Sequence, residues 1–144
     1  NRVAQWIYDK CNAIPVNQDR PELATIRRIL QLVKNDEKVL IFPEGERTRD
    51  GQLKEQGAPG IGMLIAKSKK PVLPVRLYGA FEAFPRGAKI PKPVKLTLVA
   101  GDLLDLSDLI EHSGLRGKEL YQALSDRAMQ AIGELKLPED AGER

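Results

Sequence analysis

Apolar side chains recur at spacings of three and four residues in four parts of the chain, as in a helix with one buried face. The first ten residues have the pattern of the end of such a helix. A second helix is expected from Pro21, because the fixed φ of proline suits a first helical residue. A third is expected over residues 60–69 and a fourth over residues 116–135. In the fourth segment the repeating apolar positions are Leu120, Leu124, Ala128, Ile132 and Leu135.

Shorter runs rich in strand-forming residues lie between these helical segments. Residues 38–42 (KVLIF) have the pattern of a strand that is covered on both faces. Residues 71–78 and 95–99 predict two more strands, and residues 13–16 predict a short one at a sheet edge, because it contains Pro15. Since strands alternate with helices, we expect an α/β fold with a mostly parallel sheet flanked by helices.

No internal repeat or linker divides the chain. We therefore expect residues 1–137 to belong to one domain and residues 138–144 to form a polar tail. Two loops are expected, a polar one over residues 43–57 and a Pro-, Gly- and Lys-rich surface loop over residues 85–93.

Composition narrows the class of protein without identifying a ligand. Hydrophobic residues make up 42% and charged residues 30%, which is typical of a globular domain. The net charge of +3 suits anionic partners, although an ordinary solvated surface explains it better. The single cysteine, Cys11, cannot form an internal disulfide, which fits a reducing compartment. Cys11 is expected to be a buried structural thiol. With only one histidine, His112, no metal site is expected.

The most informative segment is residues 41–51 (IFPEGERTRDG), a polar loop directly after a predicted strand. Gly45 allows backbone to approach a ligand closely. Arg47 and Arg49 are permanently charged, fork-shaped donors suited to phosphate. Glu44 would hold one of these arginines or bind a substrate hydroxyl. The alternative is a charged surface turn with local ion pairs.

This segment resembles the Phe-Pro-Glu-Gly-Thr-Arg block of the glycerolipid acyltransferase family, the 1-acylglycerol-3-phosphate (lysophosphatidic acid) acyltransferases and their relatives. Glu46 stands where the family usually has Thr. Residues 13–17 (AIPVN) resemble the second block of the family, and residues 72–75 (VLPV) its fourth. Three blocks in the correct order extend the resemblance over about residues 1–105.

The resemblance implies a glycerol-3-phosphate acyltransferase-like fold with a substrate phosphate site. Glu44, Gly45 and Arg47 would bind the phosphate, and Pro43 and Pro74 would shape the site, with a purely structural role for Pro74 as the alternative.

The second block of the family contributes another arginine, but this chain has Gln18 at that place. Arg20 lies two positions later. Either Arg20 binds the phosphate from the shifted position, or this contact is lost.

The implied reaction moves a fatty acyl group from acyl-CoA or acyl-ACP to the free hydroxyl of 1-acylglycerol-3-phosphate, giving phosphatidic acid. No permanently bound cofactor is implied. The implied partners are the lysophospholipid, the acyl donor, a membrane surface and, for one donor, acyl carrier protein. The segment would be peripheral, on the cytoplasmic face of a membrane. Nucleic acid is not expected as a partner, because aromatic residues make up only 5% of the chain.

A general base must take the proton of the attacking hydroxyl. The family supplies it with His-x-x-x-x-Asp, before the second block. This chain lacks the motif, and His112 follows the last block, where a surface or helix-capping role is expected. We therefore expect the catalytic pair upstream of Asn1 and no catalytic residue in this chain. The alternative is a non-catalytic homologue of the same fold that binds phosphate or a lipid surface.

A second candidate surface is the loop that follows the predicted strand at residues 71–78. It mixes apolar and basic residues, as a membrane-interfacial patch would; its members are Phe81, Phe84, Arg86, Lys89, Ile90 and Lys92. Packing of Phe81 and Phe84 on the core is the alternative.

Overall fold

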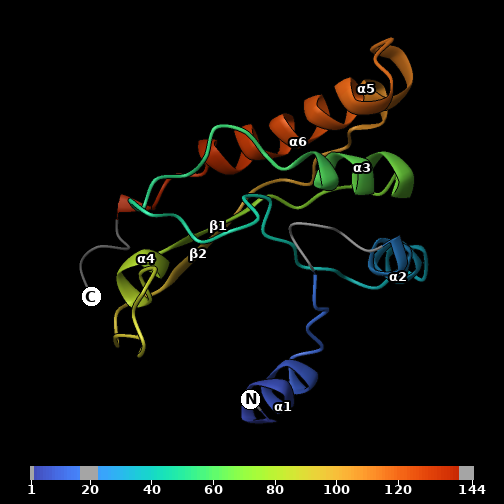
Figure 1. Ribbon diagram of the computed structural model, residues 1–144. Helices are drawn as coiled ribbons and strands as arrows, with labels where there is room; N and C mark the ends of the chain where they lie inside the picture. Colours follow the sequence, from blue (N-terminus) through green and yellow to red (C-terminus); the bar gives the residue numbers. More distant parts are fainter. Residues whose placement is uncertain (1, 17–22, 140–144) are drawn as a thin grey trace. The chain divides into compact units, whose positions relative to one another are not determined.

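The computed structural model describes residues 2–16 and 23–139 (Figure 1). Contacts between residues divide the chain into two compact units, residues 1–39 and residues 40–144. Each unit is described by itself.

The first unit contains two helices, α1 (Arg2–Lys10) and α2 (Leu23–Lys34). Ile29 is buried on α2. After α2 the chain turns at Asp36, which has a φ of 62°, and the N–H of Glu37 donates to the carbonyl of Leu32. The two predicted helices are confirmed, although Pro21 lies outside the described residues. Cys11 is exposed, so its predicted burial was wrong.

Residues 13–16 and 38–42, all of them described, form no strand, so both strand predictions were wrong. A strand needs a neighbour that accepts and donates its backbone hydrogen bonds, and neither segment has one among the described residues. Leu40 and Phe42 are 78% and 68% exposed, which contradicts the expected cover on both faces. The apolar run at residues 38–42 therefore predicted burial that the structure does not show.

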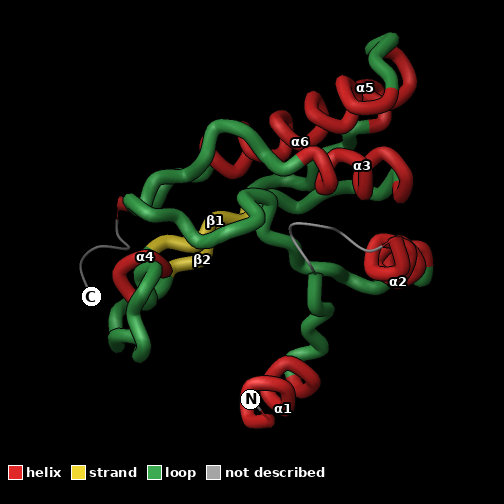
Figure 2. The backbone as a smooth tube through the Cα atoms, viewed as in Figure 1, coloured by secondary structure: helices red, strands yellow, loops and turns green. Residues whose placement is uncertain are grey.

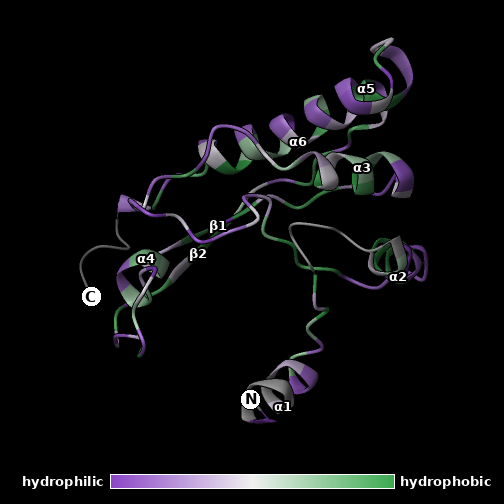
Figure 3. Ribbon diagram, viewed as in Figure 1, coloured by the Kyte–Doolittle hydropathy of each residue, from purple (hydrophilic) through white to green (hydrophobic). Residues whose placement is uncertain are grey.

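The second unit contains α3 (Pro59–Ser68), β1 (Val75–Tyr78), α4 (Ala80–Ala83), β2 (Thr97–Ala100), α5 (Ser107–His112) and α6 (Gly117–Glu134), shown by type in Figure 2. The predicted helices at 60–69 and 116–135 are confirmed as α3 and α6. Proline stands at the start of α3, where its missing N–H leaves no helical bond unmade. Figure 3 shows hydrophobic and hydrophilic residues together on α6, as an amphipathic helix requires.

The described residues form one sheet of two antiparallel strands, with Val75 opposite Ala100 and Tyr78 opposite Thr97. An antiparallel bridge between Val72 and Leu104 continues the pairing beyond Pro74. The expectation of a mostly parallel sheet was therefore wrong for these residues. The chain passes from β1 to β2 through residues 79–96, which include the short helix α4, and then runs alongside β1 in the opposite direction.

The core of this unit lies between α3 and α6 and includes Ile65, Leu106, Leu124 and Ala128. Gly62 makes the close approach possible, since a Cβ at this position would collide with the backbone of Tyr121 on α6. The other end of α6 is tied to β1. Arg76 donates to the carbonyls of Gly133 and Leu135, and the hydroxyl of Tyr78 donates to Leu135 at 2.6 Å. These bonds satisfy carbonyls that the end of a helix leaves without partners.

Candidate functional site

The segment that follows residue 41 forms a tight turn. Gly45 has a φ of 74°, a conformation that glycine adopts without a Cβ penalty. Its N–H donates to the carbonyl of Phe42 at 3.2 Å, which closes the turn. The carbonyl of Pro43 accepts from the N–H of Ala58 at 3.0 Å. The turn is thereby anchored to the residue before α3.

Glu44 is half-buried and faces Lys54 rather than an arginine. Its Oε2 accepts from the N–H of Lys54 at 3.2 Å, and the Nζ of Lys54 donates to the Glu44 carbonyl at 3.1 Å. The structure thus gives the Glu44 carboxylate a backbone donor, and no ion pair between Glu44 and an arginine is recorded among the described residues. Glu44 also lines an open pocket of about 600 Å³. The other residues that line it are Lys54, Glu55, Gln56, Gly57, Ala58, Pro59 and Gln122.

Glu46 joins two cations from different loops. Its Oε1 lies 3.1 Å from the Nζ of Lys54, and its Oε2 lies 3.0 Å from Nη1 of Arg86. The hydrogen bond and positive charge of Lys54, followed by those of Arg86, lower the pKa of Glu46 below its ordinary value. Glu46 is the residue at which the chain departs from the family block. Its role was missed because Arg86 is distant in the sequence.

Arg47 points toward the loop that follows α4. Its Nη1 donates to the carbonyl of Phe84 at 3.4 Å, and its Cζ lies 4.9 Å from the centroid of the Phe84 ring. A guanidinium carries five N–H donors. Since Arg47 is exposed, the long bond to Phe84 leaves donors that can reach an anionic oxygen. Phe84 therefore orients Arg47 and leaves most of its N–H donors available to a ligand.

The next turn is closed by the side chains of Thr48 and Asp50. Asp50 accepts from the Thr48 hydroxyl at 2.8 Å and from the N–H of Gln52 at 3.0 Å. These bonds, that from the Gln52 N–H foremost, lower the pKa of Asp50. Gly51 has a φ of 82°, and a Cβ there would lie 3.2 Å from the ring of Phe81. Phe81 therefore packs against this turn, and Arg49 within it is exposed.

Polar residues of α6 hold the segment that leads into α3. The N–H of Gly57 donates to Asp126, and its carbonyl accepts from Gln122. Ser125 is fully buried, and its hydroxyl donates to the carbonyl of Ala58 at 2.9 Å. These supports lie more than 60 residues along the chain from the turn, and sequence spacing gave no sign of them.

Pro74, which was predicted to shape the site, contacts Gly101. Pro74 is buried; its carbonyl accepts from the N–H of Gly101, and its ring lies 3.2 Å from where a Cβ of Gly101 would stand. These contacts agree with a structural role for Pro74, and its role in shaping the site stays a prediction. Arg20, together with Gln18, lies outside the described residues, so its proposed contact stays a prediction.

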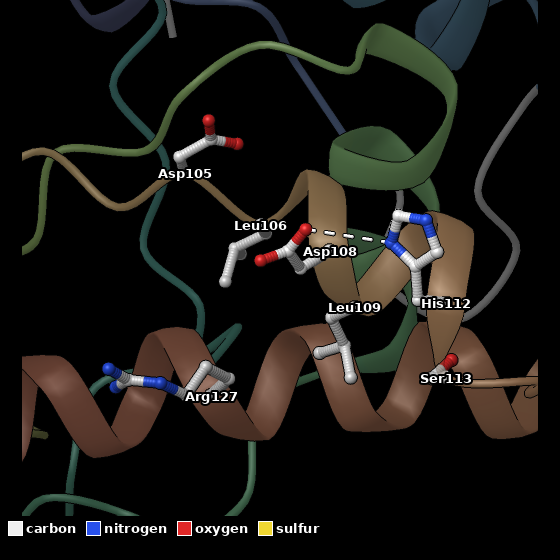
Figure 4. A pocket seen from close by; sticks show the side chains of 7 residues that line it. All are labelled: Asp105, Leu106, Asp108, Leu109, His112, Ser113 and Arg127. Atoms are coloured by element: carbon white, nitrogen blue, oxygen red, sulfur yellow. Dashed lines mark ion pairs between the residues drawn. The ribbon is translucent and has the colours of Figure 1, made fainter.

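Figure 4 shows a second open pocket, of about 470 Å³, between α5 and α6. Nδ1 of His112 lies 3.5 Å from the carboxylate of Asp108, and these side chains are 75% and 99% exposed. His112 is the last residue of α5, in agreement with the predicted surface position. On α6, Nη1 of Arg127 is buried and has no hydrogen-bond partner among the described residues. Because His112 and Asp108 are both exposed, water screens the interaction between them, so Asp108 orients His112 only weakly.

Among the described residues, no group of three or more His, Cys, Asp or Glu side chains is arranged to hold a metal ion. The helices within residues 2–16 and 23–139 are all too short or too polar to cross a bilayer.

Comparison with known proteins gives one family. Residues 1–78 match the family described as Acyltransferase. A 1-acyl-sn-glycerol-3-phosphate acyltransferase of Bacillus subtilis (strain 168) is 30% identical over 92% of this chain and 63% of its own length. The chloroplastic 1-acyl-sn-glycerol-3-phosphate acyltransferase BAT2 of Brassica napus is 30% identical over 60% of this chain and 26% of its own.

Among solved structures, the 1-acyl-sn-glycerophosphate acyltransferase PlsC of Thermotoga maritima matches with a TM-score of 0.62. The match covers 94% of this chain and 52% of that one, at 24% identity. The fold is therefore that of a PlsC-like acyltransferase. The chain spans 63% or less of the length of each of these relatives.

Proposed function

Because this chain belongs to the acyltransferase family, we propose that the whole protein transfers a fatty acyl group to 1-acylglycerol-3-phosphate, giving phosphatidic acid. The names of the two curated relatives support this acceptor. In the proposed reaction the acceptor hydroxyl gives its proton to a general base as its oxygen attacks the thioester carbonyl carbon. The carbon–sulfur bond then breaks, and the thiolate leaves and takes up that proton.

The observation that carries the proposal is the position of Arg47. An exposed guanidinium stands on a glycine-closed turn and is oriented by Phe84. A guanidinium binds a phosphate through two parallel N–H donors, which fixes the acceptor in one orientation. Glu44 and Gly45 are the turn residues beside it, and we propose that all three bind the glycerol phosphate. Arg20 is proposed as a further phosphate ligand.

We propose that the general base is supplied by residues outside these 144. The chain contains one histidine, His112, which is exposed on α5 and pairs with an exposed carboxylate. A base of this reaction needs an oriented imidazole within hydrogen-bond reach of the acceptor hydroxyl. Residues 1–137 would form the carboxyl-terminal two-thirds of one acyltransferase domain, which the structural match over 94% of the chain supports.

Acyl-CoA or acyl-ACP is the proposed acyl donor, with no permanently bound cofactor. Lipid substrates place the protein at a membrane surface, and we propose that this part is peripheral on the cytoplasmic face.

The test is an assay of the whole protein with radiolabelled acyl-CoA or acyl-ACP and 1-acylglycerol-3-phosphate, with phosphatidic acid as the measured product. Time-dependent formation of labelled phosphatidic acid supports the proposal. Absence of product with both donors, from protein that still binds the acceptor, would favour a non-catalytic phosphate- or lipid-binding homologue.

A further inference from the structure

The loop between α4 and β2 carries positive charge without compensation from its own sequence. Residues 83–101 contain four basic residues and no acidic one. The four are Arg86, Lys89, Lys92 and Lys95. Neither Lys89 nor Lys92 forms an ion pair with any residue that the structure describes. In Figure 1 this loop extends past α4, away from α3 and α5.

Apolar side chains are exposed on the same loop. Ile90 is 78% exposed, and Phe84, Val94 and Leu96 are exposed to lesser degrees. Prolines at 91 and 93 restrict the backbone next to Ile90. The N–H of Lys92 donates to the carbonyl of Ala83 at 2.7 Å, which fastens the loop to the end of α4. Ile90 is therefore held in water between two lysines by a restrained backbone.

We propose that residues 84–96 dock on an anionic lipid surface, with Ile90 inserted between the headgroups and Lys89 and Lys92 on lipid phosphates. Anionic lipid attracts each nearby lysine and also offers an apolar layer to an exposed isoleucine. Soluble phosphate would satisfy the lysines and leave Ile90 in water. Lys89 and Lys92 line neither of the two pockets described above, as they would in a site for a small anion.

Docking of this loop would also set the depth of the proposed phosphate site relative to the lipid headgroups. Arg86 pairs with Glu46, and the Arg47 guanidinium lies over Phe84. The turn at residues 42–47 (the motif turn) and residues 84–96 (the lipid-docking loop) are therefore joined at two points. This link rests on the proposed function: a loop at headgroup depth would present Arg47 to the phosphate of a lipid that remains in the membrane. The docking itself requires no catalysis.

The test is sedimentation of the chain with vesicles of equimolar phosphatidylglycerol and phosphatidylcholine, compared with pure phosphatidylcholine. At low ionic strength each lysine contributes about fivefold to partitioning, so K89Q/K92Q should bind about 25-fold more weakly. The control K67Q/K118Q makes the same charge change at exposed positions on α3 and α6 and should stay within about twofold of wild type. I90S should bind the anionic vesicles about tenfold more weakly than wild type. L103S changes another exposed aliphatic site and should weaken binding by less than twofold.

Equal losses in the loop and control variants, or no binding by the wild-type chain, would overturn the proposal. Circular dichroism of each variant checks that it is folded. Acyl transfer by the whole protein to acceptor in detergent micelles separates the two proposals. Vesicle binding without transfer would leave docking standing and overturn the function. Transfer in micelles, together with vesicle binding by K89Q/K92Q equal to that of the wild type, would support the function and overturn the docking.

Discussion

The guanidinium of Arg47 lies over the ring of Phe84, with its Cζ 4.9 Å from the ring centroid, and joins the motif turn to the loop after α4. A cation over an aromatic face is stabilised by about 0.5–1 kcal/mol at an exposed site. The same arginine donates to the Phe84 carbonyl. The side chain that would bind the acceptor phosphate is thus oriented by a residue 37 positions away.

Phe84→Ala should weaken acceptor binding, because it removes the ring that orients Arg47 while leaving the carbonyl in place. Loss of about 0.5–1 kcal/mol corresponds to a two- to fivefold rise in KM for 1-acylglycerol-3-phosphate. KM for the acyl donor should not change. Phe84→Trp, which keeps an aromatic face, is the matched control and should retain the wild-type KM. Identical kinetics for Phe84→Ala and Phe84→Trp would show that the ring does not orient Arg47.

Glu46→Gln should make stability less dependent on pH. The pKa of Glu46 is lowered below its ordinary value of 4.5, so its ionised form is favoured by folding. That contribution is present above 4.5 and is lost as the pH falls through the folded-state pKa. Urea unfolding should therefore separate wild type from Glu46→Gln at pH 7, with the difference shrinking on acidification and in high salt. Glu55→Gln, at an exposed carboxylate in the same loop, is the control. A pH-independent difference would contradict the role assigned to the Lys54 and Arg86 pairs.

Gly62→Ala should destabilise the second unit strongly. The added methyl group meets the Tyr121 backbone, which cannot move without separating α3 from α6. Overpacking of this kind costs about 1–3 kcal/mol or more. Gly60→Ala lies in the same helix with open space around its Cβ and should be neutral or stabilising by up to about 1 kcal/mol. Equal unfolding midpoints for the two variants in urea would rule out the close approach at Gly62.

Gly45→Ala should strain the motif turn, although space is available for the methyl group. The left-handed conformation costs a non-glycine residue about 1–2 kcal/mol, while Asn tolerates it better. The order of stability should be Gly45, then Gly45→Asn, then Gly45→Ala, by urea unfolding. KM for the acceptor should be lowest for the wild type, higher for Gly45→Asn and highest for Gly45→Ala. If Gly45→Asn and Gly45→Ala were equally damaging, steric exclusion by substrate, rather than backbone strain, would explain the glycine.

The parts of the fold that depend on local spacing were predicted from the sequence. Leu120, Leu124 and Ala128 repeat at helical intervals and are found along α6, and the helix expected over residues 60–69 is found as α3. Sheet direction depends instead on which segments meet. Residues 71–78 were expected in a parallel sheet, but residues 75–78 pair antiparallel with β2, which follows after residues 79–96. Nothing in either segment alone specifies that pairing.

The motif turn was located from its residues, but its contacts were not. Glu44 was expected to hold an arginine or to bind a substrate hydroxyl, and its carboxylate accepts from the backbone N–H of Lys54. Glu46 looked like a mere departure from the family block and proves to join Lys54 with Arg86. These partners are set by how loops approach one another in space, which residue spacing does not encode. Arg20 lies outside the described residues and stays a prediction.

The central claim is that Arg47 binds the acceptor phosphate. The most direct measurement is kcat/KM of the whole protein for 1-acylglycerol-3-phosphate divided by that for 1-acylglycerol, which lacks the phosphate. Loss of a charge-assisted contact of about 1.5–3 kcal/mol should lower this ratio by about 10- to 150-fold in Arg47→Ala. Arg116→Ala, at an exposed arginine before α6, should leave the ratio unchanged. A ratio in Arg47→Ala equal to that of the wild type would contradict the claim.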